Sequence, residues 1–368
     1  MSAIPPDPRV PSAGADALSE VAASGEFDDS LLDDEAALAA ADPLLRHLAE
    51  AGARVRREVL AAKEILAGLE PRGGSPRALV VAGSDARLLR AVLEPWCPVP
   101  FVAWPGPGLP GWAGVLDTVV VLAGSSGDDS ATSAVAEAVR RGCTLLVASS
   151  PHAPIAELAA SRDTTLVPVH TDDSLAVAVV TLQVLHSWGL GPDVAGEHVA
   201  QALDDEALAC SPYVDLARNP AKELAIALAD STPLVWGGSV LAARAARRVV
   251  EAMRRATGRH ALAADAEHLL PLLAATKPRD VFADPFSATE SAPRPALVVL
   301  DDGTEEASLR ERRGRLLGAA AAAGVSVHTV RAADTAGWSG VARYAALLAR
   351  GGWAAAYLAV GSSQSPRG

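Results

Sequence analysis

Short apolar runs alternate with helical patterns along most of the chain. Each run is bounded by turn residues and lacks the polar alternation of a half-exposed strand, so it predicts a strand buried on both faces of a parallel sheet. The segments between the runs repeat apolar residues at helical spacing, as at 129–141 and 172–188. The predicted strands are 78–83, 99–104, 118–124, 144–150 and 164–169, and then 232–238, 260–265, 295–302 and 325–332.

The two groups of strands follow one plan of strand, Gly/Ser turn, helix and strand. This repetition predicts an α/β fold of two tandem flavodoxin-like αβα sandwiches with parallel sheets, in which ligands lie beyond the carboxyl ends of the strands. The expected divisions are a Pro-rich, partly disordered N-terminal segment (1–40), a first domain with a leading helix (41–190), a connector (191–218), a second domain (219–360) and a tail (361–368).

Composition narrows the range of partners. The 368 residues carry a net charge of −12, so there is no basic excess to meet nucleic acid or an anionic membrane. The three cysteines form no CxxC pair, which predicts neither a zinc site nor disulfides and favours a reducing cytoplasm. The N-terminus lacks a signal-peptide pattern, and no apolar run reaches the length of a membrane span. No Gly-rich dinucleotide turn that opens a helix and no P-loop occurs, so no cofactor is expected.

The stretch AGSSGDDSAT (123–132) lies between a predicted strand and a predicted helix. A Gly/Ser-rich turn at such a position commonly holds an anion, because backbone N–H groups and the helix N-terminus point toward it. Asp128 and Asp129 stand where the anion would bind. A like-charge pair a few ångströms apart costs on the order of several kcal/mol at an effective dielectric of about 20. An acid here suits a neutral sugar, a cation-bridged ligand or no ligand.

A longer stretch around this loop resembles a SIS (sugar isomerase) domain: DTVVVLAGSSGDDSATSAVAEAVRRGCTLLVASSPHAPIAELA, residues 117–159. The tandem plan and the stretch NPAKELAIAL (219–228) resemble the bifunctional phosphoglucose/phosphomannose isomerase family over about residues 40–360. The resemblance implies a sugar-phosphate ligand and a homodimer. It implies that loop hydroxyls and backbone N–H groups hold the phosphate, which assigns ligand binding to Gly83, Ser84, Ser125, Ser126, Gly127 and Ser130.

The chain departs from the family's motifs at its chemical positions. In the loop, Asp129 replaces the family's threonine, and Ser130 replaces its glutamate. Isomerisation needs an acid that opens the sugar ring and a base that moves a proton between C1 and C2. The resemblance places Arg254 on the family's glutamate and Leu270 on its histidine. Glu251, Glu267 and His268 are candidates for an acid and a base displaced from these positions. His268 lies two positions before Leu270, and two positions along a helix turn a side chain by about 200°, which disfavours His268 as a substitute.

Several isolated residues are further candidates. Arg87 could pair with a phosphate, Ser239 is expected to cap its helix, and one of three histidines could contact a ligand, namely His152, His260 and His328. A basic helix face is expected to be solvated or to meet an acidic partner: Arg244, Arg247, Arg248, Arg254 and Arg255.

Three hypotheses remain open. In the first hypothesis, the chain is a SIS-type sugar-phosphate-binding protein that has lost its catalytic residues. The departures from the family's motifs in three separate segments favour it. Alternatively, it is an active phosphosugar isomerase with relocated acid and base residues, which requires both groups to face one cleft. The third hypothesis is a non-catalytic scaffold, which the apolar helix 172–188 and an apolar cleft would favour.

Overall fold

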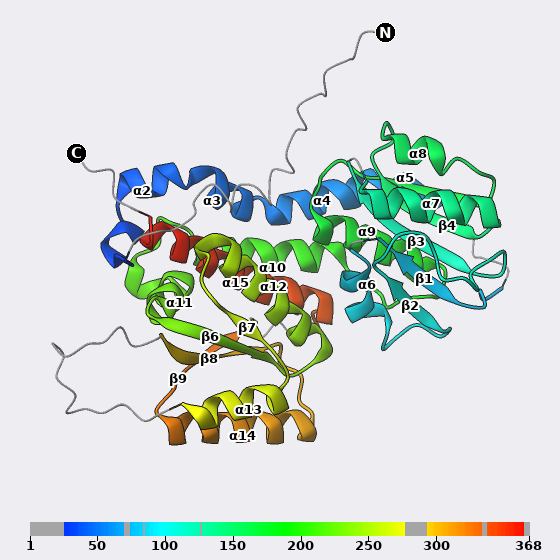
Figure 1. Ribbon diagram of the computed structural model, residues 1–368. Helices are drawn as coiled ribbons and strands as arrows, with labels where there is room; N and C mark the ends of the chain where they lie inside the picture. The colour runs from blue at the N-terminus through cyan, green and yellow to red at the C-terminus, as the bar shows by residue number, and fades with distance from the viewer. Residues whose placement is uncertain are drawn as a thin grey trace, which may run out of the picture.

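Two parallel sheets form the framework of the computed structural model, which describes residues 26–69, 74–83, 85–125, 127–276, 293–332 and 337–363 (Figure 1). The first sheet has the strand order β2-β1-β3-β4-β5, and the second has the order β7-β6-β8-β9. All of these pairings are parallel, so the predicted α/β fold with two parallel sheets is confirmed. The strands are β1 (Leu79–Ala82), β2 (Phe101–Trp104), β3 (Thr118–Gly124), β4 (Thr144–Ser149), β5 (Thr164–Pro168), β6 (Ser231–Gly237), β7 (Leu262–Ala263), β8 (Arg294–Asp301) and β9 (Ser326–Arg331).

Helices cover both faces of the first sheet. Alternate residues of β1 and β3 point to opposite faces, so Val81 and Val120 join one core while Val80 and Val121 join another. The first core lies against α6 (Ala86–Leu93) and α9 (Ser174–Ser187), and the second against α7 (Asp129–Arg141) and α8 (Pro154–Leu158). The central strands β1, β3 and β4 are therefore buried between helical layers, as their uniformly apolar sequences predict, whereas the edge strands β2 and β5 are only partly buried.

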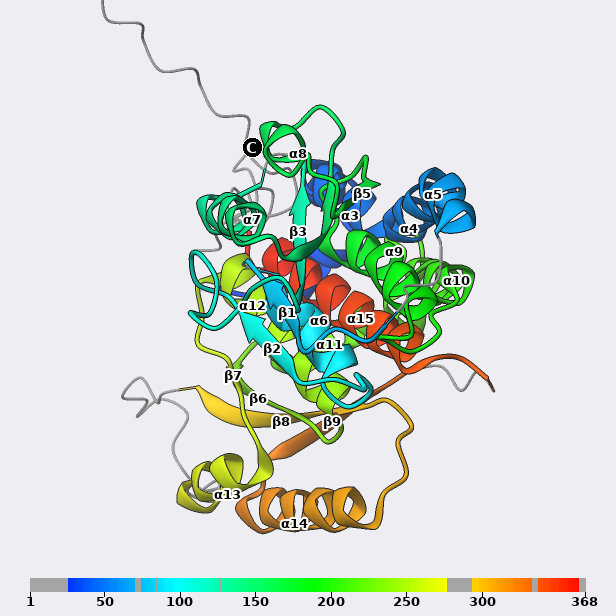
Figure 2. The same cartoon turned by 90° about the vertical axis from the view of Figure 1, so that its right-hand side faces the viewer.

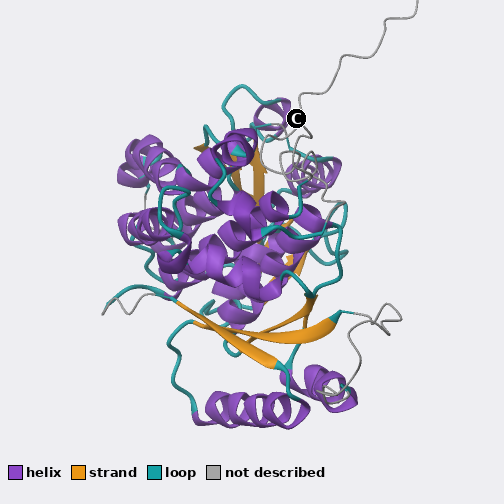
Figure 3. Ribbon diagram, turned by 90° about the vertical axis from the view of Figure 1, so that its left-hand side faces the viewer, coloured by secondary structure: helices purple, strands orange, loops and turns teal. Residues whose placement is uncertain are grey.

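The second sheet is layered in the same way. Val298 points toward α12 (Val240–Thr257) and α15 (Gly340–Gly361), and Leu297 points toward α13 (Ala266–Ala275) and α14 (Ala307–Ala323). Figure 2 shows α13 and α14 below this sheet and α12 above it. Figure 3 shows the same sheet in orange with helices on either side. The inner faces of both sheets belong to one continuous core, so the two halves pack on a shared helical layer.

The segment predicted as a connector contributes to that layer. Within 191–218 the chain forms α10 (Gly196–Ala209), which packs against α4 (Ala51–Ala61) and α15. The acidic residues of this segment favoured a connector in the prediction. One of these acids, Glu206, is instead buried and pairs with Arg350 of α15. The segment predicted as partly disordered also contains described helices, because η1 (Asp29–Leu32) and α2 (Glu35–Ala40) precede α3 (Asp42–Ala49). The leading helix is thus a series that continues through α4 to α5 (Lys63–Gly68) and runs across both halves (Figure 1).

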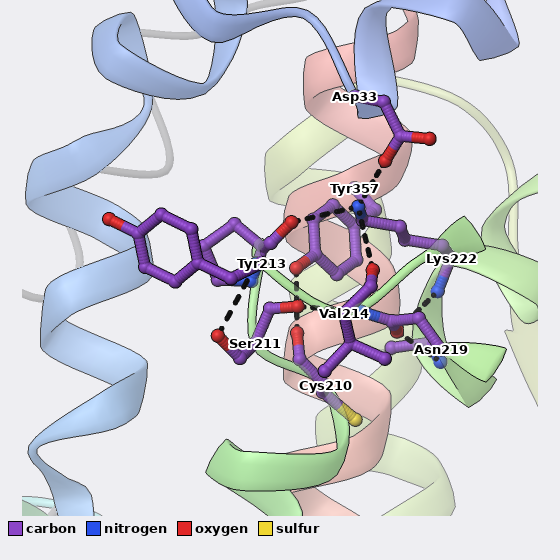
Figure 4. A network of polar contacts seen from close by, with 10 residues as sticks. Asp33, Cys210, Ser211, Tyr213, Val214, Asn219, Lys222 and Tyr357 are labelled. Carbon is purple, nitrogen blue, oxygen red and sulfur yellow. Dashed lines mark hydrogen bonds and ion pairs between the residues drawn. The ribbon is translucent and has the colours of Figure 1, made fainter.

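The stretch NPAKELAIAL forms a polar joint (Figure 4). Asn219 caps α11 (Pro220–Leu228) by accepting the N–H groups of Ala221 and Lys222 at 3.0 and 3.1 Å, as its position before proline predicts. The fully buried Lys222 Nζ donates to Asp33 Oδ1 at 2.6 Å and to two backbone carbonyls of the segment that leads through η2 (Leu216–Arg218). This joint ties the N-terminal helices to the second half.

No described helix has both the length and the apolar character that a membrane crossing requires.

Candidate functional site

The carboxyl ends of β1 and β3 form the switch point of the first sheet, where neighbouring strands lead to opposite sides. The turn after β1 contains Gly83, and the loop after β3 runs from Gly124 to Gly127. Gly83 and Gly127 have φ values of 94° and 67°, which favour glycine over other residues. A Cβ on Gly127 would lie 3.0 Å from Ile155 Cδ1, so both space and backbone conformation explain the glycine there.

The serines predicted to bind the ligand differ in placement. Ser84 and Ser126 lie outside the described residues. Ser125 is exposed beside the loop glycines, whereas Ser130 Oγ donates to the carbonyl of Pro105 at 3.4 Å and so turns toward the segment after β2. Gly83, Ser125 and Gly127 therefore share the switch point, and Ser130 lies at its flank.

Two carboxylates each accept an N–H group, one from the loop and one from the first turn of α7. The N–H of Ser125 donates to Asp172 Oδ1 at 2.8 Å, and the N–H of Ala131 donates to Asp128 Oδ1 at 2.6 Å. Asp128 is thus the N-cap of α7, a role that explains its position between loop and helix. Asp172 follows β5 and is distant in sequence, so the sequence reasoning missed it. An anion that bound the N–H of Ser125 or of Ala131 would have to displace the carboxylate that each now contacts.

The switch point of the second sheet, between β6 and β8, is closed by packing. Ser239 caps α12 as predicted, accepting the N–H of Ala242 at 3.0 Å. Its hydroxyl donates to Asp302 Oδ2, and Asp302 is only 6% exposed. A Cβ on Gly237 would overlap the backbone carbonyl of Ala242. Ser239 and Asp302 therefore satisfy each other inside the fold.

The candidate acid and base residues lie on opposite sides of the second sheet. Glu251 is on α12 and forms ion pairs with Arg248 and Arg255. Glu267 and His268 are exposed on α13, where Glu267 pairs with Arg315. The sheet separates α12 from α13, so these groups do not face one cleft (Figure 2).

The two family positions have structural contacts instead. Arg254 Nη1 donates to the carbonyl of Ala261 at 3.3 Å near the end of α12, and Leu270 packs at the edge of the core beneath α13. Neither residue presents an acid or a base to the first switch point.

The remaining candidates are scattered. His152 and His260 are exposed, and His328 lies on β9, where burial lowers its pKa. Arg87 is exposed in the first turn of α6, and Arg244 is half-buried on α12, which contacts α6. The described residues contain no cluster of His, Cys, Asp and Glu able to hold a metal ion.

Comparisons with known proteins agree with this architecture. Residues 217–367 match the family model described as the bacterial phospho-glucose isomerase C-terminal SIS domain. No curated protein matches the chain significantly. Among solved structures, a candidate phosphosugar isomerase from Silicibacter pomeroyi DSS-3 has a TM-score of 0.59 at 15% identity, covering 85% of this chain and 96% of that one.

Two other structures are similarly related. The C-terminal domain of glucosamine-fructose-6-phosphate aminotransferase from Francisella tularensis has a TM-score of 0.56 at 11% identity, with 87% of this chain and 96% of that one covered. A candidate phosphosugar isomerase from Bacillus subtilis has a TM-score of 0.55 at 17% identity, with 85% and 95% covered. At such identities these structures show the shared fold alone.

Proposed function

The chain is a SIS-domain protein of the bacterial phosphoglucose isomerase family, and we propose that it binds a sugar phosphate or related carbohydrate derivative without isomerising it. The family supports the ligand class. The observation that carries the loss of catalysis is the separation of Glu251 from Glu267 and His268 by the second sheet. Aldose–ketose isomerisation requires an acid and a base in reach of one sugar, and these residues cannot meet that condition together.

The neighbours of each candidate support the same conclusion. Glu251 and Glu267 are held in ion pairs with arginines, so both carboxylates already have partners within the fold. The positions aligned with the family's acid and base carry Arg254 and Leu270, which serve helix-end and core contacts. Each position thus has a structural role that needs no substrate.

Two measurements on the purified protein test this proposal. A thermal-shift titration with fructose 6-phosphate, glucose 6-phosphate and mannose 6-phosphate should give a saturable rise in Tm with at least one of them. A coupled isomerase assay on the same sugars should give no turnover above the blank. Turnover that disappears in Glu251→Gln or His268→Gln would instead establish an active isomerase with relocated residues. Absence of any thermal shift would favour the scaffold alternative.

Three broader properties belong to this proposal. The resemblance supports a homodimer, which sedimentation velocity tests by the mass of the particle in solution. It supports a cytoplasmic location, which cell fractionation tests. It also supports domains at 41–190 and 219–360, with 191–218 forming a helix of the shared layer rather than a plain connector.

A further inference from the structure

Asp172 is an exposed residue whose carboxylate lies on the backbone of the loop after β3. Its Oδ1 accepts the N–H of Ser125 at 2.8 Å, and a Cβ on Gly124 would lie 3.1 Å from the same oxygen. Gly124 has a φ of 58°, so both the backbone conformation and the room needed by the oxygen favour glycine there. The carboxylate therefore takes a position on the loop that an oxygen of a ligand would otherwise take.

The backbone on both sides of Asp172 is held by other contacts. Before it, the N–H of His170 donates to the buried carboxylate of Glu58 at 2.9 Å. After it, Asp173 is the N-cap of α9 and also pairs with Arg54 at 2.8 Å. Because the side chain of Asp172 is exposed, it can rotate off the loop into water while these contacts stay in place.

The carboxylate of Asp172 is weakly held on the loop. Among the residues that the structure describes, it forms one hydrogen bond and no ion pair, since the neighbouring Arg54 pairs with Asp173. Losing one hydrogen bond at an exposed place costs little, because water replaces the partner. A phosphate monoester has more acceptor oxygens and a larger negative charge than a carboxylate. It can therefore compete for the N–H of Ser125, whereas the hydroxyl of a free sugar lacks the charge to do so.

We propose that Asp172 is an internal competitor for the phosphate of the ligand at the loop after β3. The inference rests on the proposed function for its ligand class. Without ligand, Asp172 occupies the N–H of Ser125. A phosphate monoester displaces the carboxylate into water, because two anionic oxygens that share one N–H repel each other. A free sugar leaves Asp172 in place. Asp172 thus makes the loop select phosphorylated sugars, and the loop binds them more weakly than it would without the carboxylate.

Calorimetric titration with inorganic phosphate and with fructose 6-phosphate tests the competition. Asp172→Ala removes the competitor and should raise the affinity for both about tenfold. Asp172→Asn keeps an acceptor of similar shape without the charge, so its gain should be smaller, about threefold. The matched control is Asp163→Ala, which removes an exposed aspartate before the other end of β5 and should change affinity less than about twofold. Free fructose should bind no more tightly to Asp172→Ala than to the wild type.

The amide resonance of Ser125 gives a second readout in the NMR spectrum of the wild type. It should shift when phosphate is added, because the hydrogen bond from Asp172 is exchanged for one from phosphate. Phosphate that saturates the protein without moving this resonance overturns the proposal. A gain in affinity for free fructose in Asp172→Ala, equal to the gain for fructose 6-phosphate, overturns the selection of phosphorylated sugars.

The outcomes separate this inference from the proposed function. If the wild type binds phosphosugars and Asp172→Ala binds them no more tightly, the role of Asp172 fails and the proposed function stands. If only Asp172→Ala binds phosphosugars, the proposed function fails for the wild type and the competition stands. If neither protein binds a phosphosugar or inorganic phosphate, both fail.

Discussion

The turns at the two switch points differ in accessibility although they follow the same plan. In each, a glycine-containing turn leads from a central strand to a helix, and a carboxylate from another loop binds a polar group of the turn. In the first half that carboxylate belongs to the exposed Asp172, and in the second half to Asp302, which is 6% exposed. The first turn is open at the surface, and the second is sealed by α12.

This difference favours the turn of the first half as the place of the proposed binding. A carboxylate at the surface can be displaced or solvated at little cost, whereas one inside the fold is part of the packing. Loop position alone therefore does not identify a ligand site, since the second turn has the same position and no space. The first half keeps an accessible edge, where Ser125 is exposed, whereas Gly238 and Ser239 of the second turn are half-buried.

The largest expected effect comes from adding one methyl group to each turn. Gly237→Ala should lower the free energy of unfolding by about 3 kcal/mol or more, because its Cβ would overlap the Ala242 carbonyl. Gly83→Ala should cost only about 1 kcal/mol, since its Cβ has ordinary contact with Ala131 at 3.7 Å and only the positive φ opposes it. Chemical denaturation measures both, with Gly318→Ala, which meets no atom within 4 Å, as the control. Equal losses at Gly237 and Gly83 would contradict the contrast between a sealed and an open turn.

A smaller effect follows from removing the two carboxylates. Asp302→Ala leaves the half-buried Ser239 hydroxyl and the half-buried N–H of Thr304 without their acceptor, which should cost about 1–3 kcal/mol. Asp172→Ala exposes the N–H of Ser125 to water and should cost less than about 1 kcal/mol. Thermal unfolding of the matched pair measures the difference, and a loss at Asp172 as large as that at Asp302 would show that the first turn is also integral to the fold.

The smallest effect concerns the flank of the first turn. Hydrogen bonding from the N–H of Leu109 at 2.7 Å, with Arg141 adding to it, lowers the pKa of Glu137 below its ordinary value of 4.5. A lowered carboxyl pKa contributes stability above the unfolded pKa, and that contribution is lost as pH falls through the folded pKa. Stability should therefore decrease below about pH 4.5 less steeply in Glu137→Gln than in the wild type. Denaturant midpoints between pH 3 and pH 7 measure the slope, and Glu94→Gln, which removes the exposed acid that follows α6, serves as the control. Parallel curves for wild type and Glu137→Gln would refute this role.

The sequence by itself determined the local elements. Apolar runs predicted all the strands of both sheets to within a few residues, and cap chemistry predicted the starts of α11 and α12 at Asn219 and Ser239. These features depend on residues close together in the chain, where strand and helix periodicity and side-chain caps act directly. The repeated plan of strand, turn and helix predicted the tandem fold, and the resemblance added the SIS family and its ligand class.

Only the tertiary structure decided which of these residues meet. Glu206 of α10 pairs with Arg350, far along the chain, and Asp172 contacts Ser125 from a loop beyond two further strands. The separation of Glu251 from His268 follows from strand order: α12 leads from β6 outward to β7, and α13 leads back from β7 across to β8. Because such crossovers are right-handed, a reversal of direction puts the two helices on opposite faces of the sheet. Spacing along the chain carries no information about that reversal.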